Sequence, residues 1–548
     1  MDRRDFLGLV AAGGAAMVGS SGYMSAATTA VPNPAAPARR RRPNVLFIIT
    51  DDQPRSSFGF LGGQALTPNI DRLASEGVYF ERGYVASAVC TPSRFCCLTG
   101  KYASRCRDRS FLRNVTPEGQ TRVLWNTNVG PDRPSLPQVL REAGYVTGIV
   151  GKCHGISSRG YQQVPADSDP ADPDVAEILR QNQERLAEDV KQCGFDYAAS
   201  LYVGNLPSNP CAALRQHNME WITKGALDFV EQSKDRPFYL YFSTTLLHGP
   251  SPLKSLQSDP RITEAGLLDA PLQVQPSRES VLERAKAAGI KQRLAAATWL
   301  DDGVGAVLDK LDELGLAEDT LVFYFNDHGV EGGKGSCYEH GVRTPTIIRW
   351  RGSIEPGHCD QTVQNIDFAP TILDACGIGP PADMHIDGRS LLPLLTGRSV
   401  KWRDSLYFEL GYTRAVSDGR WKYIAFRIPP SGHVPLEERL QEQRQYVERA
   451  RQRGMPDRIL QEDPEARITH LGGTPGGDDT DRWQGLRVHA EHYYDPDQLY
   501  DLQNDPDEQN NLAGDLAHAA KLAEMRALLA NYLADLPGTF GEFKTQAD

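Results

Sequence analysis

The sequence predicts an α/β protein with a mostly parallel central sheet flanked by helices, and a smaller C-terminal subdomain with an antiparallel sheet. The first observation is a set of four continuous apolar runs, each typical of a strand that is buried on both faces. These runs cover residues 45–49, 145–150, 238–242 and 321–325. The second observation is that segments with helical periodicity lie between the runs, which indicates parallel strands joined by helices.

The remaining elements follow from the same patterns. Helical periodicity covers residues 69–76, 135–143 and about 285–314. From about Lys401 the chain changes to short, closely spaced apolar runs, which are typical of antiparallel strands. These runs are residues 406–409, 414–416 and 421–424, and a last run at 499–502 leads to a helix near 515–533.

The chain divides into four predicted parts. They are an export signal at 1–30, a Pro/Arg-rich linker at 31–42, a main domain at 43–400 and a C-terminal subdomain at 401–548, with a polar insertion at about 428–492. Only the main domain and the C-terminal subdomain carry the strand and helix patterns described above.

The N-terminal segment resembles a twin-arginine export signal. Arg3 and Arg4 precede Phe6, Leu7 and a Gly/Ala-rich apolar run. The expected location is therefore periplasmic or secreted, with the twin-arginine export machinery as a partner. No cysteine precedes Cys90, and no later apolar run reaches the ~18–20 residues of a membrane span, so we expect no stable membrane anchor.

The composition excludes several classes of protein. Hydrophobic residues make up 40% and charged residues 24% of the 548 positions, which is typical of a globular chain rather than a disordered one. The 59 Lys and Arg against 71 Asp and Glu give a net charge of −12, which argues against nucleic acid as a partner. Ten cysteines are too few for a disulfide scaffold.

Acidic side chains follow two of the predicted buried strands. The first strand runs into Asp51 and Asp52, and the fourth runs into Asp327 and His328. Ligands of open parallel sheets bind beyond the carboxyl ends of the strands, so these four side chains are candidate metal ligands. Three carboxylates favour Ca²⁺ or Mg²⁺, and the imidazole leaves room for Mn²⁺. The alternative is that the carboxylates are only solvated loop residues.

A cysteine motif connects the chain to a known family. Cys90-Thr91-Pro92-Ser93-Arg94 is followed by Leu98-Thr99-Gly100. These residues resemble the C-x-P-S-R signature, with its later Leu-Thr-Gly, of the formylglycine-dependent (type I) sulfatases of the alkaline phosphatase superfamily. Residues 144–154 and 327–345 resemble further motifs of that family, although Cys153 replaces the usual aromatic residue. The resemblance covers about residues 43–427 and 493–535.

The resemblance implies an alkaline-phosphatase-like fold and a set of functional residues. A formylglycine-generating enzyme would oxidise Cys90 to an aldehyde, whose hydrate has one hydroxyl to attack sulfur and a second to expel sulfate. The implied metal ligands are Asp51, Asp52, Cys90, Asp327 and His328, with Ca²⁺ as the first choice and Mn²⁺ or Mg²⁺ as alternatives. Most family members carry Asn where His328 stands, which bears on the identity of the metal. The implied catalytic residues are Cys90, Arg94, Lys152, His154, His248 and Lys334.

Each catalytic residue has an implied role. Arg94 holds the nucleophile and the carboxylates, while Lys152 and Lys334 bind the sulfate and the departing oxygen. His154 is the base that accepts the hydrate proton, and His248 is the acid that protonates the leaving alcohol. The plainer interpretations are a solvated surface position for the two lysines and a core position for His248.

The primary functional hypothesis is an exported sulfatase that hydrolyses a sulfate ester. The expected substrate is a sulfated saccharide rather than a simple aryl ester, and a sulfated small molecule remains the other possible partner. One alternative is a phosphonate monoester or phosphodiester hydrolase of the same superfamily, which uses the same aldehyde. The other alternative is a non-catalytic sulfatase homologue that binds an anionic glycan without turnover.

Overall fold

The computed structural model describes residues 42–330, 332–398, 400–452, 467–471 and 491–545. The predicted export signal, the linker up to residue 41 and about half of the predicted insertion (453–466 and 472–490) lie outside these residues. Within them, no helix is both long enough and apolar enough to cross a membrane.

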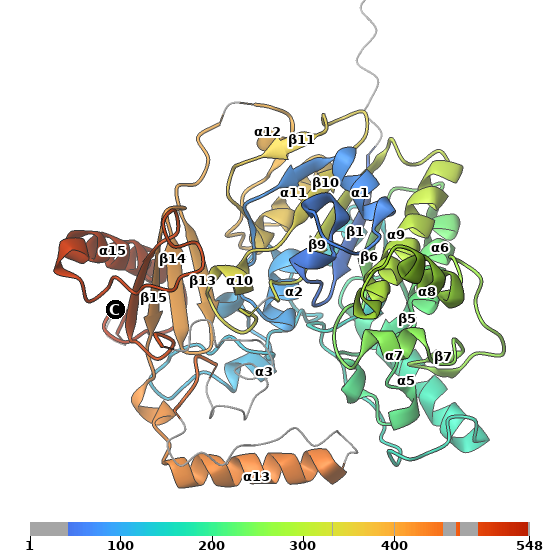
Figure 1. The fold of residues 1–548 in the computed structure, drawn as a ribbon, viewed down its shortest axis with the longest axis horizontal. Coiled ribbons are helices and arrows are strands. Elements are labelled where there is room, and N and C mark those ends of the chain that lie inside the picture. Colours follow the sequence, from blue (N-terminus) through green and yellow to red (C-terminus); the bar gives the residue numbers. More distant parts are fainter. Residues whose placement is uncertain (1–41, 331, 399, 453–466, 472–490, 546–548) are drawn as a thin grey trace, which may run out of the picture. The chain divides into compact units, whose positions relative to one another are not determined.

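The main sheet contains eight strands within the described residues, in the order β11-β2-β10-β9-β1-β6-β4-β5 (Figure 1). Their bounds are β1 Asn44–Thr50, β2 Val78–Phe80, β4 Val146–Lys152, β5 Tyr197–Tyr202, β6 Phe238–Ser243, β9 Thr320–Asn326, β10 Thr346–Arg349 and β11 Gly357–Cys359. The run from β9 to β5 is parallel throughout, whereas β10 pairs antiparallel with both β9 and β2. The predicted mostly parallel sheet is confirmed, and β1, β4, β6 and β9 are the four predicted strands.

Helices cover both faces of this sheet. Val45, Phe47 and Ile49 of β1 join one apolar cluster, and Leu46 and Ile48 join the other, because successive side chains of a strand point to opposite faces. The first cluster includes side chains of α2 Cys90–Thr99, α4 Leu136–Glu142, α5 Pro173–Gln192 and α11 Phe368–Ala375. The second includes side chains of α1 Pro68–Ser75, α6 Met219–Ser233, α8 Arg278–Ala287 and α9 Ala295–Glu313.

One predicted helix is wrong in its extent. The single helix expected over about 285–314 is two helices, α8 and α9, separated by a turn. Gly289 lies in that turn with φ +65°, a left-handed conformation that glycine adopts without steric cost and that ends a helix. The apolar periodicity continues on both sides of the turn, so the pattern alone does not reveal the break.

The smaller antiparallel sheet is also confirmed. Its strands are β13 Leu406–Leu410, β14 Thr413–Ser417, β15 Trp421–Phe426 and β16 Asp497–Asp501, and α15 Ala519–Asp535 follows. β15 and β16 are antiparallel neighbours, with Ala425 opposite Asp497, so the insertion leaves and rejoins the sheet at adjacent points. The described part of the insertion contains the helix α13 Leu436–Gln452, which the polar composition does not predict.

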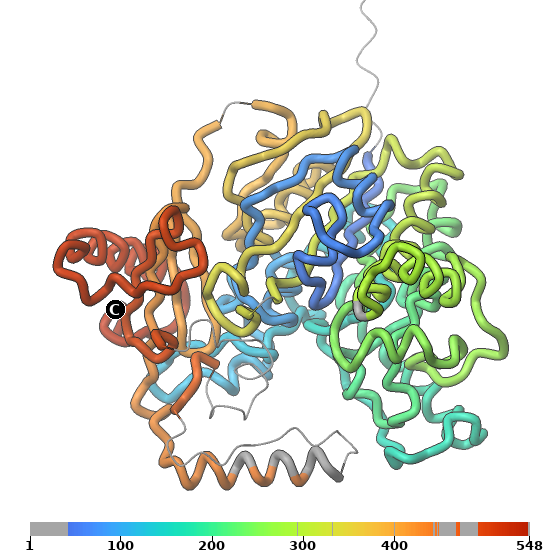
Figure 2. The backbone as a smooth tube through the Cα atoms, viewed as in Figure 1, coloured from blue at the N-terminus to red at the C-terminus, as the bar shows by residue number. Residues whose placement is uncertain are grey.

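A buried ion cluster connects the smaller sheet to the rest of the protein. Lys422 of β15 contacts Glu339 Oε1 at 2.9 Å and Glu508 Oε1 at 3.2 Å, and the Lys422 and Glu508 side chains are fully buried. Glu339 begins the short helix α10 Glu339–Val342, which follows the segment carrying Lys334. In Figure 2 the orange and red C-terminal chain lies beside this yellow segment. The smaller sheet therefore supports a loop of the site described next.

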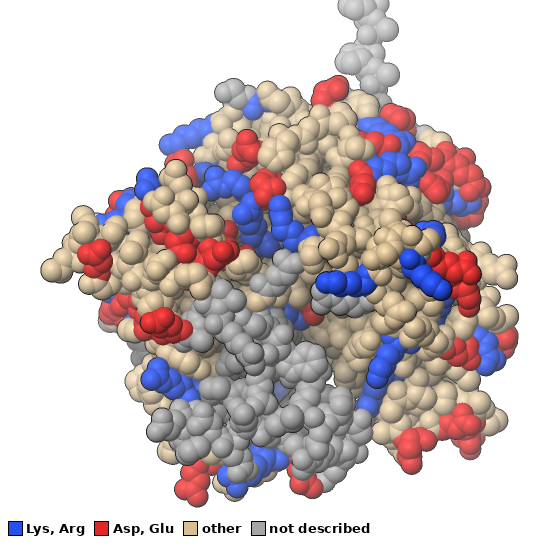
Figure 3. All heavy atoms as spheres, viewed as in Figure 1, with Lys and Arg blue, Asp and Glu red and all other residues tan. Residues whose placement is uncertain are grey.

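Charged side chains of both signs lie on the surface of the described residues. On the face drawn in Figure 3, acidic and basic side chains are interspersed over the described part of the surface.

Candidate active site

The candidate active site lies where several parallel strands of the main sheet end. β4, β6, β1 and β9 run in the same direction, so their carboxyl ends meet at one edge of the sheet. Asp51 follows β1, Asp327 follows β9, and Lys152 is the last residue of β4. The structure thus brings together side chains that are far apart in the sequence, at the edge where the strand-end acids predict a metal site.

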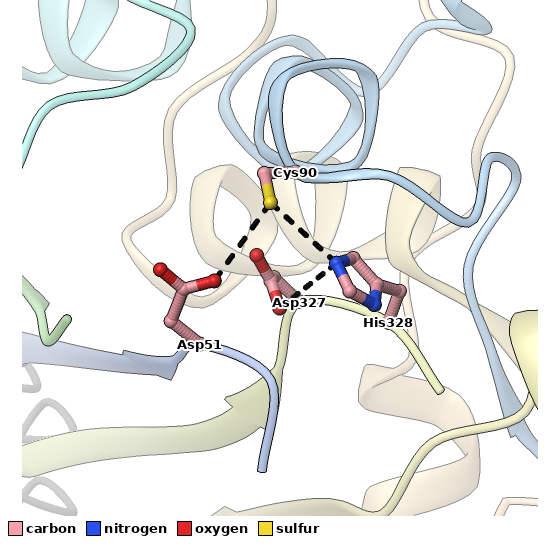
Figure 4. Close-up of side chains that lie close together, drawn as sticks. All are labelled: Asp51, Cys90, Asp327 and His328. Atoms are coloured by element: carbon pink, nitrogen blue, oxygen red, sulfur yellow. Dashed lines mark hydrogen bonds and ion pairs between the residues drawn. The ribbon is translucent and has the colours of Figure 1, made fainter. Parts of the chain in front are cut away.

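Cys90, the first residue of α2, points its sulfur toward Asp51, Asp327 and His328 (Figure 4). Its side chain is fully buried, and its Sγ lies 3.8 Å from Asp51 Oδ1 and 3.5 Å from His328 Nε2. One ligand atom from each of Asp51, Cys90, Asp327 and His328 lies within 4.8 Å of the other three. Ligand atoms on opposite sides of one Ca²⁺ are about 4.8 Å apart, because each bond is about 2.4 Å long. The spacing of the four atoms is therefore compatible with a single cation between them.

Hydrogen bonding prepares His328 to act as a ligand. Its Nδ1 lies 2.9 Å from the carbonyl oxygen of Gly329, which can only accept, so Nδ1 carries the hydrogen. Its Nε2 faces Asp52 Oδ1 at 3.4 Å and Asp327 Oδ1 at 3.5 Å. When the ring is neutral, the lone pair of Nε2 points at these carboxylates. The donor set of carboxylates and one imidazole fits a divalent cation.

Asp52 takes an unusual backbone conformation that serves the site. Its φ is +52°, in the left-handed region that Asp tolerates better than most residues. In an extended strand, Asp51 and Asp52 would point to opposite faces. Asp52 lies outside the ligand group of Asp51, Cys90, Asp327 and His328, but its left-handed conformation lets it form a second possible ligand group with Asp51 and His248.

Three cationic side chains hold the carboxylates. Lys152 donates to Asp51 and also, at 2.7 Å, to Asn205 Oδ1. Lys334 donates to both carboxylate oxygens of Asp52 at 2.7 Å. Arg94 donates to Asp327 Oδ2 at 3.1 Å and to Ser243 Oγ at 2.6 Å. Neither lysine is a solvated surface residue, because the side chain of Lys152 is 0% exposed and that of Lys334 is 6% exposed.

The clustered charges shift several pKa values. Burial opposes ionisation of Cys90, but Lys152 and Lys334 overcome it and lower the pKa of the thiol to about 6. Burial raises the pKa of the Asp327 carboxyl to about 7. Burial also opposes the charged form of His328, but the adjacent Asp327 carboxylate raises the pKa of its ring to about 9. Such opposed shifts within one cluster are typical of functional sites.

The two candidate acid–base histidines lie at the same edge of the sheet. His248 Nε2 lies 3.5 Å from Asp52 Oδ2, and its Nδ1 donates to the carbonyl oxygen of Gly249 at 2.7 Å. His154 Nδ1 is buried and has no hydrogen-bond partner among the described residues. Burial and the nearby Lys152 hold the pKa of His154 well below its usual value, so its ring is neutral and able to accept a proton.

Gly151 allows Lys152 to reach the site. The register between β4 and β5 shifts between Val150 and Gly151, and Gly151 has φ +83°. A Cβ at this position would lie 1.8 Å from the carbonyl oxygen of Ser243 on the neighbouring strand β6. Only glycine permits this approach, which places the end of β4 directly beside the end of β6.

Three residues at this edge are absent from the sequence predictions. Ser243, the last residue of β6, accepts from Arg94 and donates to the carbonyl oxygen of Lys152 at 2.6 Å. The strand-end argument that found Asp51 could also have found Ser243. Asn205 contacts Lys152, and His217 contacts the segment that carries His248, but no local pattern distinguishes either of them.

A buried thiol beside a carboxylate and imidazole cluster, with cations around it, is typical of hydrolases that act on anionic esters. Comparison with known proteins identifies which such class is present. The family model described as Sulfatase matches residues 43–378. The chain belongs to the sulfatase family.

Individual relatives agree with this assignment. Steryl-sulfatase of Mus musculus is 29% identical over 489 residues, which cover 73% of this chain and 73% of that protein. N-acetylgalactosamine-6-sulfatase of Canis lupus familiaris is 29% identical over 413 residues, which cover 69% of this chain and 71% of that protein. The protein is therefore a sulfuric ester hydrolase, and a sulfate ester is its substrate.

Solved structures share the fold. One is a sulfatase structure described under the metabolism of multiple glycosaminoglycans by Bacteroides thetaiotaomicron, with a TM-score of 0.59 and 21% identity. It is matched over 90% of this chain and 99% of its own. Another, with a TM-score of 0.55 and 20% identity, is described as a complex with its substrate D-glucosamine-2-N,6-O-disulfate and covers 90% of this chain and 98% of its own. At these identities the likeness concerns the fold.

Proposed function

We propose that this protein is an exported sulfatase that removes sulfate from a sulfated saccharide, through a formylglycine made from Cys90 and one divalent cation, with Ca²⁺ as the first choice. The observation that carries the proposal is the position of Cys90, buried between Asp51 and His328 at the ligand cluster. Export is supported by the Arg3-Arg4 pattern of the N-terminus.

The saccharide substrate is the finer part of the proposal. It is supported by the fold shared with the sulfatase bound to D-glucosamine-2-N,6-O-disulfate and by the relative named N-acetylgalactosamine-6-sulfatase. The relative named steryl-sulfatase acts, by its name, on another kind of substrate. Assays with sulfated amino sugars and with a steryl sulfate separate these classes, and a faster steryl reaction would contradict the saccharide proposal.

Two groups supply the chemistry that the encoded side chains lack. A formylglycine at position 90 supplies, when hydrated, a nucleophilic hydroxyl and a second hydroxyl for the release of sulfate. A divalent cation held by Asp51, Asp52, Asp327 and His328 supplies positive charge that stabilises an ionised hydroxyl and the sulfate oxygens.

The chain's own residues bind the sulfate group, hold the carboxylates in place and transfer protons. Lys152 and Lys334 lie beside position 90 and bind sulfate oxygens, exchanging part of their contact with Asp51 and Asp52. Arg94 fixes Asp327 and the end of β6, so that the carboxylates stay in place during turnover. His248 holds a proton for the leaving oxygen on Nε2, and the neutral His154 accepts the proton that is lost at position 90.

Mass spectrometry of the protein from its native host tests the nucleophile. Trypsin releases Gly83–Arg94, in which Cys90 is the single cysteine. Conversion to formylglycine makes this peptide lighter by about 18 Da than the thiol form. An unmodified thiol in all of the protein would contradict the proposed mechanism and favour the non-catalytic glycan binder.

Rates on an aryl sulfate and on the corresponding aryl phosphonate test whether the protein is instead a phosphonate monoester hydrolase. A phosphonate monoester hydrolase from Silicibacter pomeroyi shares the fold with a TM-score of 0.52 and 21% identity. We expect kcat/KM for an aryl sulfate to exceed that for the corresponding aryl phosphonate monoester. A higher kcat/KM for the aryl phosphonate would contradict the proposed specificity for sulfate esters and favour a phosphonate monoester hydrolase.

Removal of the metal is expected to lower both activity and stability. Without a cation, the carboxylates of Asp51, Asp52 and Asp327 converge with less compensating charge, so the melting temperature falls by a few degrees. We expect sulfatase activity to fall by about 100-fold or more after exhaustive chelation. Metal content is measured by mass spectrometry, and Ca²⁺ should restore more activity than Mn²⁺ or Mg²⁺. Full activity in metal-free protein would contradict the metal site.

A further inference from the structure

His217 is a buried histidine that belongs to none of the sequence motifs. It lies between the short helix η5 Ala212–Leu214 and α6, and only 1% of its surface is exposed. Its ring reaches the segment 245–250, which follows β6 and carries His248. Both ring nitrogens lie within hydrogen-bond distance of atoms of this segment.

The hydrogen bonds of His217 define its tautomer. Nε2 lies 2.8 Å from the carbonyl oxygen of His248 and 3.3 Å from that of Pro250. Both oxygens can only accept, so Nε2 carries the hydrogen and is shared between them. Nδ1 of the neutral ring then accepts the hydroxyl hydrogen of Thr245 at 2.8 Å. Burial lowers the pKa of His217 to about 4, which keeps the ring neutral.

The ring therefore connects both ends of the segment that presents His248. Thr245 is at the start of this segment and Pro250 at its end, and the peptide N–H of His248 donates to the carbonyl oxygen of Thr245 at 3.2 Å. His248 Nδ1 donates to the carbonyl oxygen of Gly249. With its backbone and Nδ1 fixed in this way, His248 has only Nε2 left to face Asp52.

His217 is itself held by the surrounding helices. Its peptide N–H donates to Ser255 Oγ of α7 (Pro252–Leu256) at 3.0 Å, and the same hydroxyl donates to Gln216 Oε1 at 3.0 Å. The next residue, Asn218, accepts from the N–H of Trp221 and caps α6. The backbone at His217 is thus fixed against α7 and beside the start of α6, and neither helix carries a residue of the site.

We propose that His217 is a positioning residue for the sulfatase reaction, which holds the segment 245–250 so that His248 Nε2 is aimed at the departing oxygen of the substrate. The inference rests on the proposed function, in which His248 is the acid. In that step a hydroxyl at position 90 forms a bond to sulfur as the bond between sulfur and the departing oxygen breaks. The electron pair of the broken bond stays on the departing oxygen, and the proton of His248 Nε2 moves to that oxygen to give the alcohol. A misaligned His248 leaves the alkoxide or phenoxide unprotonated.

The dependence of the rate on the leaving group tests this role. A weakly basic 4-nitrophenolate departs without much help, whereas an unsubstituted phenolate needs the proton more. In His217→Phe, we expect kcat/KM to fall by about tenfold or more on phenyl sulfate and by less than about threefold on 4-nitrophenyl sulfate. His217→Gln keeps a donor for the two carbonyl oxygens and should give an intermediate loss. It also remains usable if the phenylalanine variant does not fold.

Two further variants make the outcome decisive. His248→Gln provides the reference and should show the same selectivity, more strongly. Asn218→Ala removes the α6 cap beside His217, so it should lower the melting temperature without any leaving-group selectivity. Suppose that His248→Gln loses more kcat/KM on phenyl sulfate than on 4-nitrophenyl sulfate, whereas His217→Phe and His217→Gln lose equally on both. That result would overturn the inference about His217 and leave the proposed function intact. A non-selective His248→Gln instead overturns the assigned role of His248 and, with it, the inference.

Discussion

Replacing Cys90 with alanine is expected to lower kcat/KM for 4-nitrophenyl sulfate by about 10⁴-fold or more, because the side chain that becomes the nucleophile is lost. The neighbouring Asp51 and His328 remain in place, since alanine fits a position where the thiol makes only long contacts of 3.8 and 3.5 Å. The melting temperature should therefore change little. Steady-state kinetics and thermal unfolding measure the two effects separately.

Cys96 provides a matched control for this experiment. It lies on the same helix, α2, and is as fully buried as Cys90, but it makes no contact with the ligand cluster. Cys96→Ala should keep its activity within about threefold of the parent, with a loss of stability typical of a small core truncation. An active Cys90→Ala variant, or an inactive Cys96→Ala variant with normal folding, would contradict the assignment of the nucleophile.

Replacing Arg94 is expected to affect both stability and activity. The guanidinium is fully buried and contacts Asp327 at 3.1 Å, so Arg94→Ala should lower the free energy of unfolding by about 3–5 kcal/mol. Arg94→Lys keeps the charge but loses the fork that reaches Asp327 and Ser243 together. We expect kcat to fall by about 100-fold in the lysine variant. Denaturant unfolding and steady-state kinetics check the two results.

A second buried ion pair separates the structural effect from the catalytic one. Arg278 and Glu220 contact each other at 2.9 Å, with side chains 6% and 5% exposed, and neither belongs to the ligand cluster. Arg278→Ala should destabilise the fold to a similar degree while the folded enzyme keeps its kcat. If Arg278→Ala loses as much kcat as Arg94→Lys, the loss at Arg94 reflects general loosening of the fold and not the site.

The long apolar strands could be predicted from the sequence because burial on both faces requires an uninterrupted apolar run. β1, β6 and β9 have this property, and each is buried along its whole length. β2 and β11 contain only three residues each, too few for a pattern to emerge. β5 has the mixed sequence Tyr-Ala-Ala-Ser-Leu-Tyr and lies at the edge of the sheet.

The candidate site could be predicted in part for a similar reason. Asp51 and Asp327 directly follow buried strands, so the edge at which they meet follows from the topology alone. Cys90 required the family motif, because no periodicity or strand-end position in the neighbouring sequence marks a reactive thiol. Asn205 and His217 lie in irregular segments, and their contacts with the site depend on long-range packing that a local pattern does not encode.

The burial of Cys90 also has a consequence for timing. His328, which closes one side of the thiol, lies 238 positions later in the chain. A ribosome that adds about 5–20 residues per second needs roughly 12–48 s to cover that interval. During this time the thiol cannot be enclosed, because the strand that precedes His328 does not yet exist. A modifying enzyme therefore has access to the Cys90 thiol until the later part of the chain is synthesised and folds. Slower synthesis lengthens this period, so it should raise the fraction of protein in which Cys90 is converted to formylglycine.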